Sequence, residues 1–128
     1  MGLFDKIKKG FESAVVNARM DDFLIDRIDK ILSERWDKVS EKKPDNIDGV
    51  SIEEEAGYKF VYRFNDRAVE VELEHEYPVV KMEIHCDGSK YETHVQVSEF
   101  VEKEENGFSI KNETKLREII SGAAGMVE

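Results

Sequence analysis

The chain has few cysteines and prolines, the residues that cross-link a small domain or interrupt its helices and strands. Its 128 residues include one cysteine, Cys86, and two prolines. A single cysteine excludes an internal disulfide framework and is compatible with a reducing, cytoplasmic location. No apolar run approaches the roughly 20 residues that span a bilayer, and the first residues carry no secretory h-region. We therefore expect one domain, 1–128, that folds on its own core without a cofactor.

Positive charge is also scarce. The chain has 19 Lys and Arg against 29 Asp and Glu, a net charge of −10 and a pI near 4.9. Direct binding to a nucleic-acid backbone is not expected, because it requires concentrated positive charge. The imbalance is local, since residues 1–43 carry a net +1 and residues 44–128 a net −11. The acidic part predicts a protein partner that is basic.

The common catalytic motifs are missing as well. The sequence has no glycine-rich phosphate loop, no His-Glu-x-x-His, no Cys-x-x-Cys and no Gly-x-Ser-x-Gly. His85 and Cys86 are neighbours, but adjacent strand residues point to opposite faces, so they form no dyad. These absences favour a protein that is not an enzyme, and we predict no catalytic residue.

The first third of the chain has helical periodicity. Apolar residues recur every three or four positions in two stripes that are out of phase. Continuing the first stripe would bring Asp22 and Asp29 onto the apolar face. We therefore predict a break near residues 20–22, with one amphipathic helix over 1–20 and a second over 21–43.

From about Val50 the period changes from 3.6 to 2, as in half-buried strands. Five alternating segments with short connections predict an antiparallel sheet over 50–101, and the last apolar period predicts a helix over 112–122. The predicted class is α+β. It comprises N-terminal amphipathic helices, a five-stranded antiparallel meander covered on one face by helices, and a C-terminal helix.

The outer face of this sheet is the most distinctive surface. Alternation gives it a ladder of glutamates that we predict to bind a protein partner: Glu70, Glu72, Glu74, Glu83 and Glu92.

The same face suggests a metal site as an alternative. If the turn at 87–90 contains four residues, His85 faces Glu92 and Glu83 faces His94, a donor set that suits zinc. If the turn contains two residues, His85 faces Lys90 and the site is poor. Cross-strand charge pairing on a solvated face explains the same residues more simply.

The inner face contains polar residues that could surround a small ligand instead. These residues are Tyr62, His75, Tyr91 and Thr93. The simpler interpretation is that the tyrosines bury their rings and keep their hydroxyls at a wet rim.

Residues 1–20 combine large apolar side chains with Lys6, Lys8 and Lys9. Such a helix suits packing on its own sheet, pairing with a second copy of the chain, or weak contact with an anionic membrane surface. The leading hypothesis is a small acidic binding or adaptor protein, similar in kind to a chaperone, an inhibitor or an immunity protein. The alternative is a domain that binds a small ligand or a metal.

Overall fold

The computed structural model describes the backbone of residues 3–44, 46–47, 50–51 and 57–128, and the side chains of 15–44 and 57–128. Its elements, in chain order, are α1 Leu3–Arg35, β1 Asp37–Lys42, β2 Asn46–Ile47, β3 Val50–Ser51, β4 Gly57–Phe64, β5 Arg67–Glu76, β6 Val79–Cys86, β7 Ser89–Gln96, α2 Val97–Phe100, β8 Val101–Glu104, β9 Gly107–Ile110 and α3 Glu113–Gly125.

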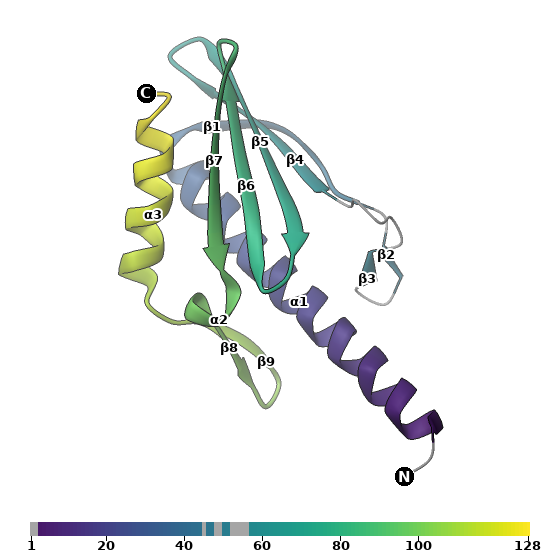
Figure 1. Ribbon diagram of the computed structural model, residues 1–128. Coiled ribbons are helices and arrows are strands. Elements are labelled where there is room, and N and C mark those ends of the chain that lie inside the picture. The colour runs from purple at the N-terminus through teal and green to yellow at the C-terminus, as the bar shows by residue number, and fades with distance from the viewer. Residues whose placement is uncertain (1–2, 45, 48–49, 52–56) are drawn as a thin grey trace.

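A five-stranded antiparallel sheet with the order β1-β4-β5-β6-β7 forms the centre of the fold (Figure 1). β4, β5, β6 and β7 follow one another through tight turns. The turns at residues 65–66 and 87–88 have positive φ angles at both positions, as two-residue hairpin loops require. The predicted α+β class and the antiparallel sheet are therefore confirmed.

The fifth strand is not the predicted one. β1, which was predicted to be the end of a second helix, pairs with the free edge of β4, whereas Val50–Ser51 pairs with Asn46–Ile47 in a separate two-stranded sheet. Every residue of β1 is exposed, so the strand has no apolar period that the sequence could reveal. The remainder of the predicted segment at 50–52, Ile52, lies outside the described residues.

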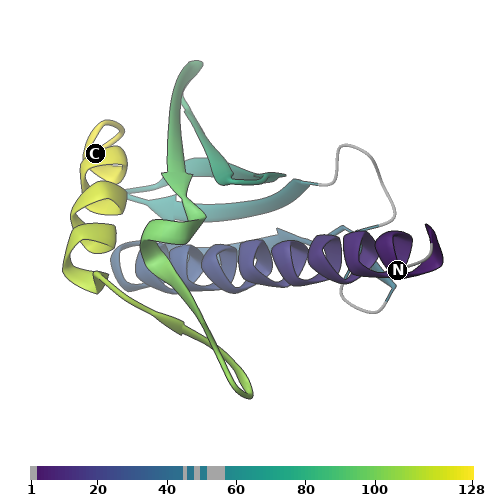
Figure 2. The ribbon, with the colours of Figure 1, turned by 60° about the horizontal axis from the view of Figure 1, so that its bottom comes forward.

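α1 is one continuous helix of 33 residues, so the predicted break at 20–22 is wrong. It crosses the inner face of the sheet, and its first turns continue past the end of the sheet (Figures 1 and 2). The apolar side chains predicted for residues 1–14 lie outside the described part. Among the described residues, no helical stretch combines the length and apolarity needed to cross a bilayer.

The core lies between α1, the inner face of the sheet and α3. Fully buried members include Leu32 on α1, Val71 and Met82 on the sheet, and Leu116 on α3. α3 continues three residues past its predicted end at 122, because Ala123 and Ala124 pack into the same core.

Candidate functional site

Acidic residues recur along one side of α1 that faces the sheet. Asp22, Asp26 and Asp29 are spaced by four and three residues, so they lie above one another on the helix surface. The facing strand β4 turns Tyr58, Phe60 and Tyr62 inward, toward the helix. An acidic line on a helix is thereby set against an aromatic line on a strand.

A groove of about 190 Å³ lies between these two lines. The carboxylates form one wall, while apolar and aromatic side chains form the rest, with one lysine at the margin. The lining residues are Asp22, Ile25, Asp26, Asp29, Lys43, Tyr58 and Phe60.

At one end of the groove, Asp29 accepts hydrogen bonds from a tyrosine and a lysine, besides a longer one of 3.4 Å from Ser33 of the same helix. The Tyr62 hydroxyl donates a hydrogen bond of 2.6 Å to Asp29 Oδ1, and Lys38 Nζ donates one of 2.9 Å to Oδ2. Burial, followed by this hydrogen bond, raises the pKa of Tyr62, so the hydroxyl keeps its proton and remains a donor. Lys38 Nζ also lies 5.1 Å from the centre of the Phe60 ring. At this end of the groove, the ammonium group of Lys38 is therefore already bound by a carboxylate and an aromatic ring.

At the other end, Asp22 meets His75 of β5 and Tyr58 of β4. The Tyr58 hydroxyl donates a hydrogen bond to Asp22 Oδ1, and the same oxygen lies 2.9 Å from His75 Nε2, out of line for a hydrogen bond. The Tyr58 and His75 rings are stacked with their centroids 5.7 Å apart. Burial, followed by the bond to Asp22, raises the pKa of Tyr58. Asp22 thus accepts a hydrogen bond from β4 and lies close to the imidazole of β5, so it brings α1 into contact with both strands.

Asp21 lies beside this group and is only 1% exposed. Its Oδ2 is 4.0 Å from His75 Nδ1, while its Oδ1 has no hydrogen-bond partner in the described part of the structure. Burial raises the pKa of Asp21 to about 6, against the lowering effect of His75, and Asp22 adds a smaller increase. A buried carboxyl with this pKa changes charge close to neutral pH.

The structure separates the residues predicted to surround a ligand. Tyr62 and His75 both contact aspartates of α1, as described above. Tyr91 and Thr93 lie on β7, where they pair with Ile84 and Met82. Tyr91 instead lines a second hollow, of about 160 Å³, that includes Arg67 and Val127.

The predicted acidic face is interleaved with lysines. Lys59 lies 2.7 Å from Glu70 and 3.7 Å from Glu72, and Lys81 lies 3.7 Å from Glu74 and 3.5 Å from Glu92. These contacts lower the negative potential that the glutamates present to a partner.

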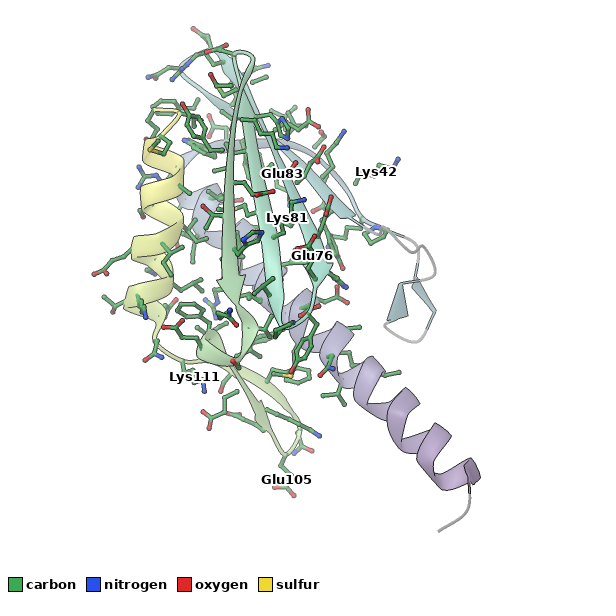
Figure 3. The ribbon with its side chains drawn as sticks, in the orientation of Figure 1. Lys42, Glu76, Lys81, Glu83, Glu105 and Lys111 are labelled. Atoms are coloured by element: carbon green, nitrogen blue, oxygen red, sulfur yellow. The ribbon has the colours of Figure 1, made fainter. Side chains whose placement is uncertain are left out.

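Among the described glutamates of that face, Glu83 has the most charged partners, and it lies beside Lys81 (Figure 3). Lys81, Lys90 and His85 approach its carboxylate at 3.1, 3.4 and 3.3 Å. The hydrogen bond from Lys81, together with those from Lys90 and His85, lowers the pKa of Glu83 to about 2 despite its burial.

The turn at 87–88 contains two residues, so the register of the metal alternative is the poor one. His85 pairs with Lys90, His94 pairs with Lys81, and Glu83 pairs with Glu92. The ligand atoms of His85, Glu83 and Glu72 nevertheless lie within 4.8 Å of one another. Glu72, which comes from β5, was absent from the predicted set of metal ligands.

The sequence contained one signal for the groove. Acidic residues on an apolar helical stripe predict a break, but in the structure they mark the side of α1 that has polar partners on the sheet. Comparisons with models of protein families, with curated proteins and with solved structures find no match to this chain.

Proposed function

We propose that this protein is a small non-enzymatic binding protein that holds a basic segment of a protein partner in the groove between α1 and β4. The observation that carries the proposal is the line of carboxylates at Asp22, Asp26 and Asp29 beside the rings of Tyr58 and Phe60. Carboxylates form ion pairs with a lysine or arginine. Aromatic rings form cation–π contacts with its charged group and pack against its apolar stem.

Lys38 supports this chemistry from within the chain. Its ammonium group contacts Asp29 at 2.9 Å and lies over the Phe60 ring at 5.1 Å. A lysine from a partner would make the same two kinds of contact further along the groove, with Asp26 and Asp22 as acceptors.

Single contacts of this type are weak. An exposed ion pair contributes about 0–1 kcal/mol and an exposed cation–π contact about 0.5–1 kcal/mol. A useful affinity therefore needs a segment with several basic residues, and the complex should weaken as salt rises. The glutamates of the sheet support the proposal less well, because lysines of the same sheet contact them.

The test uses a fluorescent peptide of alternating lysine and glycine, with fluorescence anisotropy as the readout. Asp26 is the best position to change, since it is exposed and its described ion pair is with Lys30 of the same helix. We expect Asp26→Lys to weaken binding about tenfold or more at low salt, and the charge-matched substitution Asp66→Lys in the exposed β4–β5 turn to weaken it much less.

The sheet face is tested in the same assay. A Glu70→Gln/Glu74→Gln variant should bind the peptide as the wild type does. Loss of binding in this variant, with Asp26→Lys unaffected, would move the interface to the sheet. If all three variants lose affinity for the peptide equally, binding depends on net charge alone and the groove is not the binding site.

Binding of a divalent transition metal is a second candidate function, favoured by the approach of Glu72, Glu83 and His85. Lys81 and Lys90 would have to leave Glu83 for a cation to enter. Zinc that binds the folded protein must raise its Tm, and His85→Asn must abolish the rise. An unchanged Tm at millimolar zinc would dismiss this candidate.

A further inference from the structure

Asp22, which lines the groove, is preceded on α1 by Asp21, a buried carboxyl group that is not part of the groove lining. Asp21 is 1% exposed, and within the described part of the structure its Oδ1 accepts no hydrogen bond. An acceptor left unpaired in the interior is costly when it is charged, so such a group keeps a strong tendency to bind a proton.

The groups that face Asp21 come from three elements. His75 of β5 lies 4.0 Å away, Asp22 is its neighbour on α1, and Tyr58 of β4 contacts Asp22. Asp22 and Tyr58 also line the groove. Asp21 is therefore linked to the groove through His75, which lies near both Asp21 and the lining residue Asp22.

We infer that Asp21, with His75 and Asp22, forms a proton-linked switch beside the groove, in which binding of a cationic segment and loss of the Asp21 proton favour one another. This inference rests on the proposed function. It adds that the affinity for a basic partner rises as the buried carboxyl becomes charged.

The direction follows from linkage. A cation in the groove stabilises the charged form of Asp21, so it releases a proton, and by reciprocity deprotonation of Asp21 tightens binding of the cation. The raised pKa of Asp21, about 6, brings this change into the range between pH 5 and 7. His75 lies between the two carboxylates and carries the opposite charge when protonated, so it must be tested separately.

The experiment measures the Kd of the lysine–glycine peptide at about pH 5, 6, 7 and 8 at constant low ionic strength. We expect the wild type to bind roughly three- to tenfold more tightly at pH 7 than at pH 5, an effect typical of one added charge at a site. In Asp21→Asn most of the pH dependence of the Kd should disappear. In His75→Gln the pH dependence that is due to Asp21 should remain. Asp66→Asn, in an exposed turn, is the matched control.

A second measurement does not depend on a variant. Calorimetric titration of the wild type with the peptide near pH 6, in two buffers of different ionisation enthalpy, should report release of a fraction of a proton on binding.

The fold of each variant is checked by the fluorescence of Trp36, the single tryptophan, which is buried.

The outcomes separate the two proposals. Absence of peptide binding at every pH overturns the proposed function and the switch together. Binding that keeps its pH dependence in Asp21→Asn, or that releases no proton from the wild type, overturns the switch alone. If His75→Gln loses the pH dependence of binding and Asp21→Asn keeps it, the effect belongs to the histidine, and the switch is overturned as well.

Discussion

Tyr62 on β4 and Asp29 on α1 are joined by a hydrogen bond of 2.6 Å between the tyrosine hydroxyl and Oδ1 of the carboxylate. The two residues are 33 positions apart in the chain. This bond supplies a partner for a carboxylate on the inward side of α1. It explains how an acidic residue can occupy that side while the helix continues to Arg35.

We first predict that Tyr62→Phe destabilises the protein by about 1–2 kcal/mol, because it removes a donor to a charged acceptor in a largely buried position. Urea unfolding followed by far-UV circular dichroism measures the change. Tyr91→Phe is the control, since Tyr91 is only half-buried, and it should alter the free energy of unfolding by less than about 0.5 kcal/mol. Equal effects of the two substitutions would mean that the bond to Asp29 contributes nothing.

The second prediction concerns pH and Asp21. Because the pKa of Asp21 in the folded protein is raised from 3.8 to about 6, the folded state binds the proton more tightly than the unfolded state. This group therefore lowers stability as pH rises from about 4 to 6, and the penalty is complete above pH 6.

Asp21→Asn should accordingly stabilise the protein by about 2–3 kcal/mol at pH 8 and by much less near pH 4, as the size of the shift implies. Chemical unfolding at the two pH values tests this. Asp66→Asn, which changes the same charge in an exposed turn, should show no such difference. A stabilisation by Asp21→Asn that is the same at both pH values would contradict the buried-charge explanation.

The third prediction has the opposite sign and concerns Glu83. The hydrogen bond from Lys81 is the largest cause that lowers the pKa of Glu83, from 4.5 to about 2. The charged form of Glu83 therefore stabilises the folded state above about pH 4.5, and this stabilisation is lost as the pH falls toward 2. We expect Glu83→Gln to cost about 1–2 kcal/mol at pH 7, after allowance for solvent screening, and less than half of that at pH 3.

Glu92→Gln is the comparison for Glu83→Gln. Glu92 is exposed and lies 3.5 Å from the same Lys81, so its loss should change stability by less than about 0.5 kcal/mol. If the two variants melt alike at pH 7, the convergence of donors on Glu83 does not stabilise the sheet.

The fourth prediction concerns the end of the chain, beyond the predicted end of the last helix at residue 122. Ala123, Ala124 and Val127 are buried, and Arg67 Nη2 donates a hydrogen bond of 2.7 Å to the Val127 carbonyl. Deletion of 123–128 should therefore destabilise the protein by about 2–4 kcal/mol, as expected for loss of a buried branched side chain and its neighbours.

Deletion of Glu128 alone is the control, because it removes an ion pair with the exposed residue Arg35 and one backbone hydrogen bond of 3.3 Å to Ala124, but no buried side chain. It should change the Tm by no more than a few degrees. A full deletion that melts like this control would show that the last turn of α3 and the tail contribute little.

Strand faces and the order of β4 to β7 in the sheet could be predicted from local patterns, whereas the exact residue pairs could not. Phe60 pairs with Val71, as a two-residue turn at 65–66 requires, and Leu73 pairs with Met82, which is one of the two registers that alternation allows at the turn near 77–79. A one-residue slip would turn every apolar side chain of a strand outward, so the period of 2 restricts the register strongly. At residues 87–88, where two turn lengths kept the same faces, the backbone conformation decided between them.

Local sequence patterns therefore establish the α+β class, the inner face of the sheet and the location of the acid excess, because these depend on neighbours within a few residues. Tertiary structure alone decided that α1 continues through Asp21 and Asp22, that β1 completes the sheet, and that the carboxylates of α1 meet Tyr58 and His75. Asp22 and Tyr58 are 36 positions apart. A polar residue on an apolar stripe has the same local pattern whether its partner is water at a helix break or a hydroxyl on a distant strand, so only the folded chain distinguishes the two.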